Sequence, residues 1–191
     1  ALDSRVEQWL SRRSSHVFTY TNAGKQHMTD QGTPSDKVTV VVNTTDTDSL
    51  RASRDASTLE TTAALRRQHG LVDSRVVLFV GAFDQPKELP FLLEAMDRVV
   101  AKEPRVTLVL AGAGPEEAAV RKMAATRPYA RVIGRLNEEQ LGRFSTLTDL
   151  LVMPGRIGLV AVDALALGVP VVTTNYPFHA PEADYLQDGV D

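Results

Sequence analysis

The chain has 191 residues, 43% of them hydrophobic and 24% charged, which is ordinary for a soluble globular protein of one substantial domain, or one domain and a piece of another. Its formal net charge of −3 argues against a nucleic-acid partner that is attracted by overall charge. The absence of cysteine excludes disulfides, thiol nucleophiles and zinc–cysteine sites, and no apolar run is long enough to span a bilayer.

Apolar strand patterns alternate with amphipathic helix patterns along almost the whole chain. The predicted strands are 17–20, 38–42, 76–80, 107–111, 131–133, 150–153 and 171–173. The predicted helices are 4–13, 23–31, 57–69, 89–102, 116–126, 138–146 and 159–167. Because the strands are near-continuous runs of apolar residues and the two element types alternate, we predict an α/β fold with a doubly wound parallel sheet.

A polar, strand-poor stretch interrupts this pattern, and we interpret residues 47–57 as a linker. Residues 1–46 before it supply two βα units, which are too few to bury a core alone. Residues 58–191 supply the larger domain. The chain starts at Ala1 instead of methionine and stops where another element is expected, so we expect a piece of a longer polypeptide, truncated at its C-terminus.

The most informative stretch is the turn that follows the strand at 150–153 and opens the next helix. In a doubly wound sheet this turn lies outside the carboxyl ends of the strands, where ligands bind. A helix that begins near Gly158 leaves the amide N–H groups of Gly158, Leu159 and Val160 unpaired, and phosphate is their natural ligand. A Gly-x-x-Gly turn alone more often serves packing, so that interpretation stays open.

Two charged side chains belong to the same sheet edge. Asp163 interrupts an otherwise apolar helix, where a buried acid without a partner is costly, and this favours a hydrogen bond to a ligand hydroxyl. Lys87 follows the strand at 76–80 and the turn that starts at Gly81, and its compact charge suits phosphate. A solvated surface position is the commoner fate of a single lysine.

Three further loops follow strands. Gly112 begins a glycine-rich turn that could form a wall of the crevice, and the backbone of Gly134-Arg135 could contact a base edge. After the last strand, His179 and Glu182 could contact a substrate or each other, although a loop histidine is more often structural than catalytic. Asn43-Thr44-Thr45 matches a glycosylation acceptor, but nothing else indicates secretion, so we interpret it as a coincidence.

Taken together, these loops resemble one family. Their order is a strand and Gly-x-x-x-x-x-Lys, then Ala-Gly-x-Gly-Pro, then Ile-Gly-Arg-Leu, then Met-Pro-Gly-Arg-Ile-Gly-Leu-Val-Ala-Val-Asp. The series resembles the carboxyl-terminal, donor-nucleotide-binding lobe of GT-B glycosyltransferases of family 4 (glycosyl transferases group 1) over residues 76–191. Residues 4–46 resemble, less specifically, the end of the amino-terminal acceptor lobe.

The resemblance implies two Rossmann-like lobes with the active site between them. It implies transfer of a sugar from a nucleotide-diphosphate sugar with retention at the anomeric carbon, with no cofactor and no bound metal. It also implies that Lys87 holds the diphosphate, Asp163 contacts the ribose, the backbone of 158–160 donates to the donor, and Gly134-Arg135 lies near the base.

Two positions depart from the family's pattern. Ala82 stands where the family has an arginine on the diphosphate, and Gly155 stands where it has a glutamate on the donor sugar. We therefore expect weaker donor binding or a changed donor choice. In a similar branch without that glutamate, His179 or Glu182 would take over part of the sugar recognition.

The leading interpretation is a nucleotide-sugar-dependent glycosyltransferase, with no catalytic residue assigned and with a lipid, glycan or small-molecule acceptor. The alternative is a non-catalytic nucleotide-binding or structural lobe, since most of the acceptor lobe is missing. A nicotinamide-dependent enzyme lacks its Gly-x-Gly-x-x-Gly fingerprint here, and no carboxylate pair of a glycoside hydrolase is evident. We expect a cytoplasmic location, or the inner face of the membrane if the missing lobe associates with it peripherally.

Overall fold

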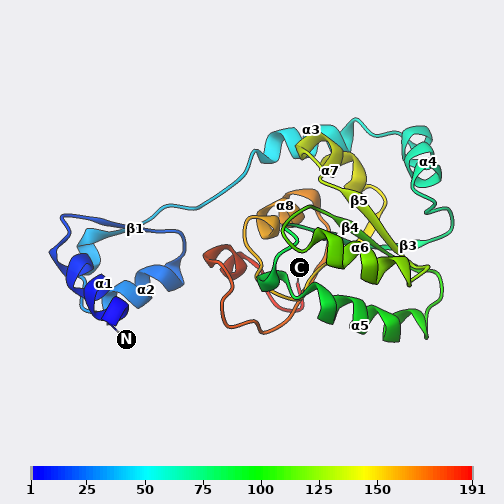
Figure 1. The fold of residues 1–191 in the computed structure, drawn as a ribbon. Helices are drawn as coiled ribbons and strands as arrows, with labels where there is room; N and C mark the ends of the chain where they lie inside the picture. The colour runs from blue at the N-terminus through cyan, green and yellow to red at the C-terminus, as the bar shows by residue number, and fades with distance from the viewer. Residues whose placement is uncertain (1, 191) are drawn as a thin grey trace.

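The computed structural model describes residues 2–190, with side chains from residue 5 onward. A small N-terminal part is joined by an extended segment to a much larger part (Figure 1). The small part consists of α1 (Leu2–Arg13), β1 (Val17–Thr19), α2 (Asn22–Asp30) and β2 (Val38–Val40). The larger part begins with α3 (Thr47–Asp55) and α4 (Leu59–Gln68).

The rest of the larger part alternates strands and helices. In chain order these are β3 (Arg75–Val80), α5 (Leu89–Val100), β4 (Val106–Ala111), α6 (Glu117–Ala125), β5 (Ala130–Gly134), α7 (Glu138–Ser145), β6 (Thr148–Met153), α8 (Val160–Leu167) and β7 (Val171–Thr173). Short 3₁₀ turns lie at Gln85–Lys87 and Pro181–Tyr185. Each predicted strand and helix is present, with ends that differ by no more than two residues.

The five strands of the larger part form one parallel sheet in the order β5-β4-β3-β6-β7. The chain runs outward from β3 through β4 to β5, then returns to the other side of β3 and runs through β6 to β7. The predicted doubly wound parallel sheet is therefore confirmed. Its switch point, where such sheets bind ligands, lies between the carboxyl ends of β3 and β6.

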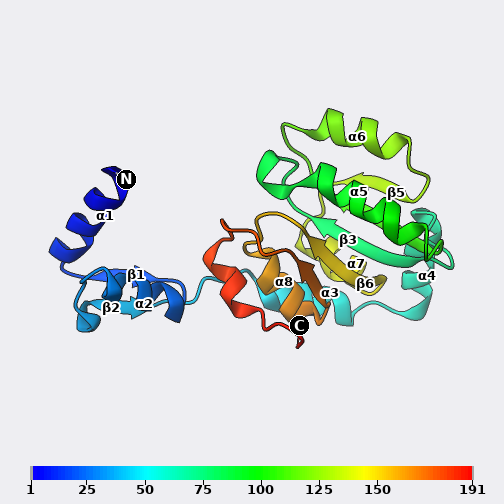
Figure 2. The same cartoon turned by 90° about the horizontal axis from the view of Figure 1, so that it is seen from below.

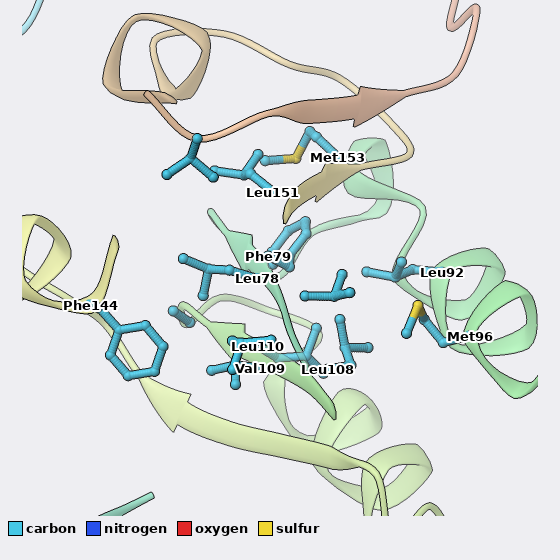
Figure 3. Packing of buried hydrophobic residues seen from close by; sticks show 14 of the residues in the cluster. Leu78, Phe79, Leu92, Met96, Leu108, Val109, Leu110, Phe144, Leu151 and Met153 are labelled. Carbon is cyan, nitrogen blue, oxygen red and sulfur yellow. The ribbon is translucent and has the colours of Figure 1, made fainter. Parts of the chain in front are cut away.

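Helices cover both faces of this sheet. In Figure 1, α5 and α6 lie below the sheet, and α3 and α7 lie above it. In Figure 3, Leu92 and Met96 of α5 approach the strands from one side, and Phe144 of α7 approaches from the other. Every residue of β4 is buried, which agrees with a sheet covered on both faces.

The small part contrasts with this well-filled core. Its strands β1 and β2 form a two-stranded parallel sheet. Within residues 5–40, Val38 is the only buried hydrophobic residue, whereas Trp9 and Phe18 are 57% and 65% exposed. A sheet of two strands does not form a stable domain by itself, so the stability of the described chain comes mainly from the larger part.

The structure corrects the predicted linker. Residues 47–55 form helix α3, which packs against α7 and α8, and its Leu50 is only 1% exposed. The close approach depends on Gly142 of α7, because a Cβ atom there would lie 2.5 Å from the Leu50 carbonyl oxygen. The extended crossing between the two parts is instead the segment 41–46 (Figures 1 and 2).

We predict that Leu50→Ala lowers the free energy of unfolding by about 2–4 kcal/mol, because it removes a buried side chain from the contact between α3 and the rest of the larger part. The matched control is Leu59→Ala at a position that is 92% exposed, where a change within about 0.5 kcal/mol is expected. Urea unfolding measures both. Equal effects of the two variants would mean that α3 is not docked.

Candidate functional site

Two turns meet at the switch point of the sheet. One follows β3 and contains Lys87, and the other follows β6 and contains Arg156. The amide of Arg156 donates a hydrogen bond to the Pro86 carbonyl oxygen at 2.7 Å, and the Lys87 ammonium donates to the Arg156 carbonyl oxygen at 2.5 Å. Backbone and side-chain bonds therefore join the two turns in both directions.

Gly155 makes this meeting possible. An added Cβ atom there would lie 2.0 Å from the Pro86 carbonyl oxygen and 2.9 Å from the Lys87 Cα. Contacts this short are never tolerated, so no larger residue fits at Gly155 unless the turn at Lys87 moves. The glutamate that the resembled family has at this position could not occupy the present geometry.

Helix α8 begins directly beyond this turn, one residue later than predicted. Its first flanking residue, Leu159, supplies no side-chain cap, and the Ala161 amide donates to the Gly158 carbonyl oxygen. Within residues 2–190 the amide N–H groups of Gly158, Leu159 and Val160 have no hydrogen-bond acceptor. These three donors, with the positive end of the helix dipole, make the turn attractive to an anion.

Asp163 lies in the first turn of α8 and is partly buried. Its carboxylate accepts a 2.7 Å hydrogen bond from the Thr45 hydroxyl, which comes from the crossing segment 118 residues earlier. Burial raises the pKa of Asp163, the Thr45 hydrogen bond opposes that rise, and the negative charge of Glu138 adds to it. The acid predicted to need a hydroxyl partner thus has one from its own chain.

Glu182 is the most buried carboxylate near this turn, at 4% exposure. Its Oε1 accepts a 2.5 Å hydrogen bond from the Asn43 side-chain amide, and its Oε2 would lie 3.9 Å from a Cβ atom added at Gly158. The Tyr185 hydroxyl accepts a 3.1 Å hydrogen bond from the backbone N–H of Asn43. It donates one to the Tyr20 carbonyl oxygen, also at 3.1 Å. These contacts join the small part and the crossing segment to the 3₁₀ turn Pro181–Tyr185.

His179 has both ring nitrogens engaged within the chain. Nδ1 accepts a 3.2 Å hydrogen bond from the Ile157 amide, so Nε2 carries the proton and donates to the Thr174 carbonyl oxygen at 2.9 Å. This arrangement holds the loop after β7 against the turn before α8. The structure does not bring His179 and Glu182 into a hydrogen bond with each other.

Lys87 is partly buried between the two turns. Burial lowers the pKa of its ammonium group, the carboxylate of Asp84 raises it, and the positive charge of Arg156 lowers it again. One oxygen of Asp84, Oδ1, is buried without a hydrogen-bond partner. The Lys87 charge therefore sits beside one carboxylate and one like charge.

The other predicted loops lie along the same sheet edge but serve mainly backbone packing. The Gly112 amide donates to the Gly134 carbonyl oxygen at 2.8 Å, and a Cβ atom at Gly112 would lie 1.9 Å from the Gly81 carbonyl oxygen. A Cβ atom at Gly81 would lie 3.6 Å from the Lys87 side chain. Arg135 is exposed, and within residues 2–190 no hydrogen bond joins it to the turn before α8.

The sequence analysis missed the residues that reach this site from the crossing segment. Asn43 and Thr45 were set aside as a chance acceptor sequence, yet they contact Glu182 and Asp163. No local pattern marks them, because their partners are more than a hundred residues away in the chain. Arg156 was likewise not singled out, because its place beside Lys87 depends on the order of the strands.

Among residues 2–190, no group of three or more His, Asp or Glu side chains is arranged to hold a metal ion. None of the helices there has the length and apolar character needed to cross a membrane.

A doubly wound parallel sheet covered by helices on both faces defines a lobe of the Rossmann-like α/β class. The chain belongs to the glycosyl transferases group 1 family, whose sequence profile matches residues 74–191. Its fold is that of GT-B glycosyltransferases, as its structural neighbours show.

Characterised relatives with similar sequences are longer enzymes. Glycogen synthase of Mycobacterium tuberculosis is 29% identical over 178 residues, which are 89% of this chain and 40% of that protein. Alpha-D-kanosaminyltransferase of Streptomyces kanamyceticus is 27% identical over 125 residues, which are 62% of this chain and 32% of that protein. This chain therefore spans less than half of either relative.

Solved structures with the same fold include HepE of Anabaena in complex with UDP-glucose, with a TM-score of 0.74 and 20% sequence identity. The match covers 99% of this chain and 52% of HepE. TarM also matches, with a TM-score of 0.71 and 15% identity over 99% of this chain and 35% of that chain. Since these matches cover 99% of this chain, they extend into the small part.

We predict that Gly155→Ala lowers the free energy of unfolding by about 1–3 kcal/mol, because the new methyl group must displace the turn at Lys87. Gly158→Ala is the matched control, since its nearest contact would be 3.5 Å, and we expect a change within about 0.5 kcal/mol. Denaturant unfolding of both variants measures the difference. Two equally stable variants would contradict the close contact of the turns.

A second prediction concerns the carboxylate of Asp163. Thr45→Val removes a hydrogen bond that lowers the pKa of Asp163, so this pKa should rise further above its ordinary value. Thr45→Ser keeps the hydroxyl and should leave the pKa near that of the unmodified chain. Carbon-13 NMR titration of the side-chain carboxyl reports it directly, and an unchanged value in the valine variant would show that the bond is absent in solution.

Proposed function

We propose that this chain is the donor-binding lobe, with part of the acceptor lobe, of a retaining glycosyltransferase that uses a nucleotide-diphosphate sugar. The observation that carries the proposal is the set of unpaired amides at 158–160 beside Lys87, at the switch point of the sheet. Family membership and a neighbour of the same fold, solved in complex with UDP-glucose, support a nucleotide-sugar donor. The acceptor is a lipid, a glycan or a small molecule.

The chemistry of this site fits departure of a diphosphate. When the glycosidic bond to the donor breaks, negative charge grows on the leaving nucleoside diphosphate while the sugar becomes oxocarbenium-like. Amide donors that are already fixed, together with a nearby ammonium, stabilise that charge without any proton transfer or reorganisation. The partial burial of Lys87 strengthens its interaction with an anion, because less water screens the charge.

The remaining assignments of the site follow from this placement. Asp163 is proposed to accept a hydrogen bond from a ribose hydroxyl, in exchange for the one it accepts from Thr45. His179 and Glu182 are proposed to contribute to recognition of the donor sugar, and Gly134-Arg135 to lie near the base. No metal or cofactor is part of the proposal.

We predict that the chain binds at least one of UDP, GDP and ADP, and that Lys87→Ala weakens this binding about 10- to 100-fold by removing a charged donor to the diphosphate. Lys122→Ala, on the exposed surface of α6, is the control and should bind as the unmodified chain does. Isothermal titration calorimetry measures the affinities. A chain that binds none of the three diphosphates would overturn the proposal.

A second candidate function is a nucleotide-binding lobe without catalysis, and one observation favours it. Two acidic groups of the site, Asp163 and Glu182, already have partners in the crossing segment. Hydrolysis of the nucleotide sugar whose diphosphate binds separates the two candidates. Binding with slow release of free sugar supports the transferase, and binding without hydrolysis supports the lobe alone.

A further inference from the structure

Arg156 has no role assigned so far, and, like Arg98 and Arg135, it forms no ion pair within the described residues. Five other arginines form ion pairs with carboxylates, namely Arg54, Arg105, Arg121, Arg127 and Arg143. The Arg156 guanidinium is exposed and, within the described residues, has neither an ion pair nor a hydrogen bond. Its five donors are therefore available to a ligand.

The backbone of Arg156, in contrast, is held firmly. Its amide donates to the Pro86 carbonyl oxygen, its carbonyl accepts from Lys87, and the residue before it is Gly155, which fits tightly against the facing turn. The side chain therefore starts from a fixed point beside the Lys87 ammonium. Only one residue, Ile157, separates it from the unpaired amides that begin at Gly158.

Two positive charges are thus placed close together. Burial is the main cause that lowers the pKa of Lys87, the carboxylate of Asp84 in the same turn opposes it, and the positive charge of Arg156 adds a smaller lowering. Like charges held side by side repel each other, and an anion between them removes that cost. A diphosphate carries enough negative charge to balance both cations.

We propose that Arg156 is a second cationic ligand of the donor diphosphate, next to Lys87. This inference rests on the donor site proposed above and adds a residue to it. The planar guanidinium can donate two parallel hydrogen bonds to two oxygens of one phosphate, whereas the lysine ammonium acts as a compact point charge, so the two side chains supply different contacts. Arg156 would then distinguish a diphosphate from a nucleoside that lacks phosphate.

The test compares three variants of the full chain with one ligand pair. The probe is whichever of UDP, GDP and ADP the unmodified chain binds, together with the matching nucleoside. We expect Arg156→Ala to weaken diphosphate binding about tenfold or more and to leave nucleoside binding unchanged. Arg156→Lys should recover part of the loss, and Arg98→Ala, an exposed arginine on α5, should behave as the unmodified chain does.

The pH dependence provides a readout that a purely structural role would not move. Diphosphate binding should be lost as the pH rises through the pKa of Lys87, which burial lowers, Asp84 raises and Arg156 lowers further. In Arg156→Ala the pKa of Lys87 should therefore be higher, and the alkaline limit, which is the pH above which binding is lost, should move upward. This is expected even though Arg156→Ala binds more weakly at neutral pH. Arg98→Ala should leave the limit in place.

The outcomes separate this inference from the proposed function. If the unmodified chain binds no nucleoside diphosphate, the donor site itself is wrong. If it does bind and Arg156→Ala binds equally well with the same alkaline limit, only the role of Arg156 is wrong. A loss for diphosphate and nucleoside alike, with a lowered melting temperature, would also overturn the inference, because it would show a general loss of structure.

Discussion

The close contact between the turn after β3 and the turn after β6 is the constraint on which the site depends. The strand order places the carboxyl ends of β3 and β6 side by side, but only a residue without a Cβ atom lets their turns touch. Gly155 meets that requirement, and the backbone and lysine hydrogen bonds of the contact then fix where Lys87, Arg156 and the start of α8 lie. The grouping of these two cations with the start of α8 thus follows from a packing requirement.

The crossing segment links this site to the small N-terminal part. Thr45 and Asn43 contact Asp163 and Glu182, the carboxylates nearest to the start of α8. Leaving a partly buried carboxylate without a hydrogen-bond donor costs free energy, which favours arrangements that supply one. A ligand hydroxyl that replaced the Thr45 hydroxyl would give Asp163 the same kind of hydrogen bond. The contact between the crossing segment and Asp163 would then be broken. Occupancy of the site and the position of the small part would then be coupled.

The sequence predicted the sheet because its signals are local. Apolar runs and helical spacing are properties of neighbouring residues, and they located each strand and all helices but α3. Helix α3 was not predicted because Leu50 is its one buried residue, so its sequence has no apolar stripe. Its docking depends on a surface of α7 around Gly142, which a linear pattern does not reveal. In the site, the glycine turns, Lys87 and Asp163 could be picked out, but Thr45, Asn43 and Arg156 could not, since their neighbours come from distant segments.

The two cations of the site have different physical properties, and the difference bears on how the site would release its ligand. Arginine stays charged at all accessible pH values, whereas burial lowers the pKa of Lys87, so that its charge is held at some cost. A free nucleoside diphosphate carries one more negative charge than the esterified diphosphate of a donor sugar. If both cations contact the diphosphate, they hold the product more tightly than the donor. The arrangement that stabilises the leaving group would therefore also slow its departure.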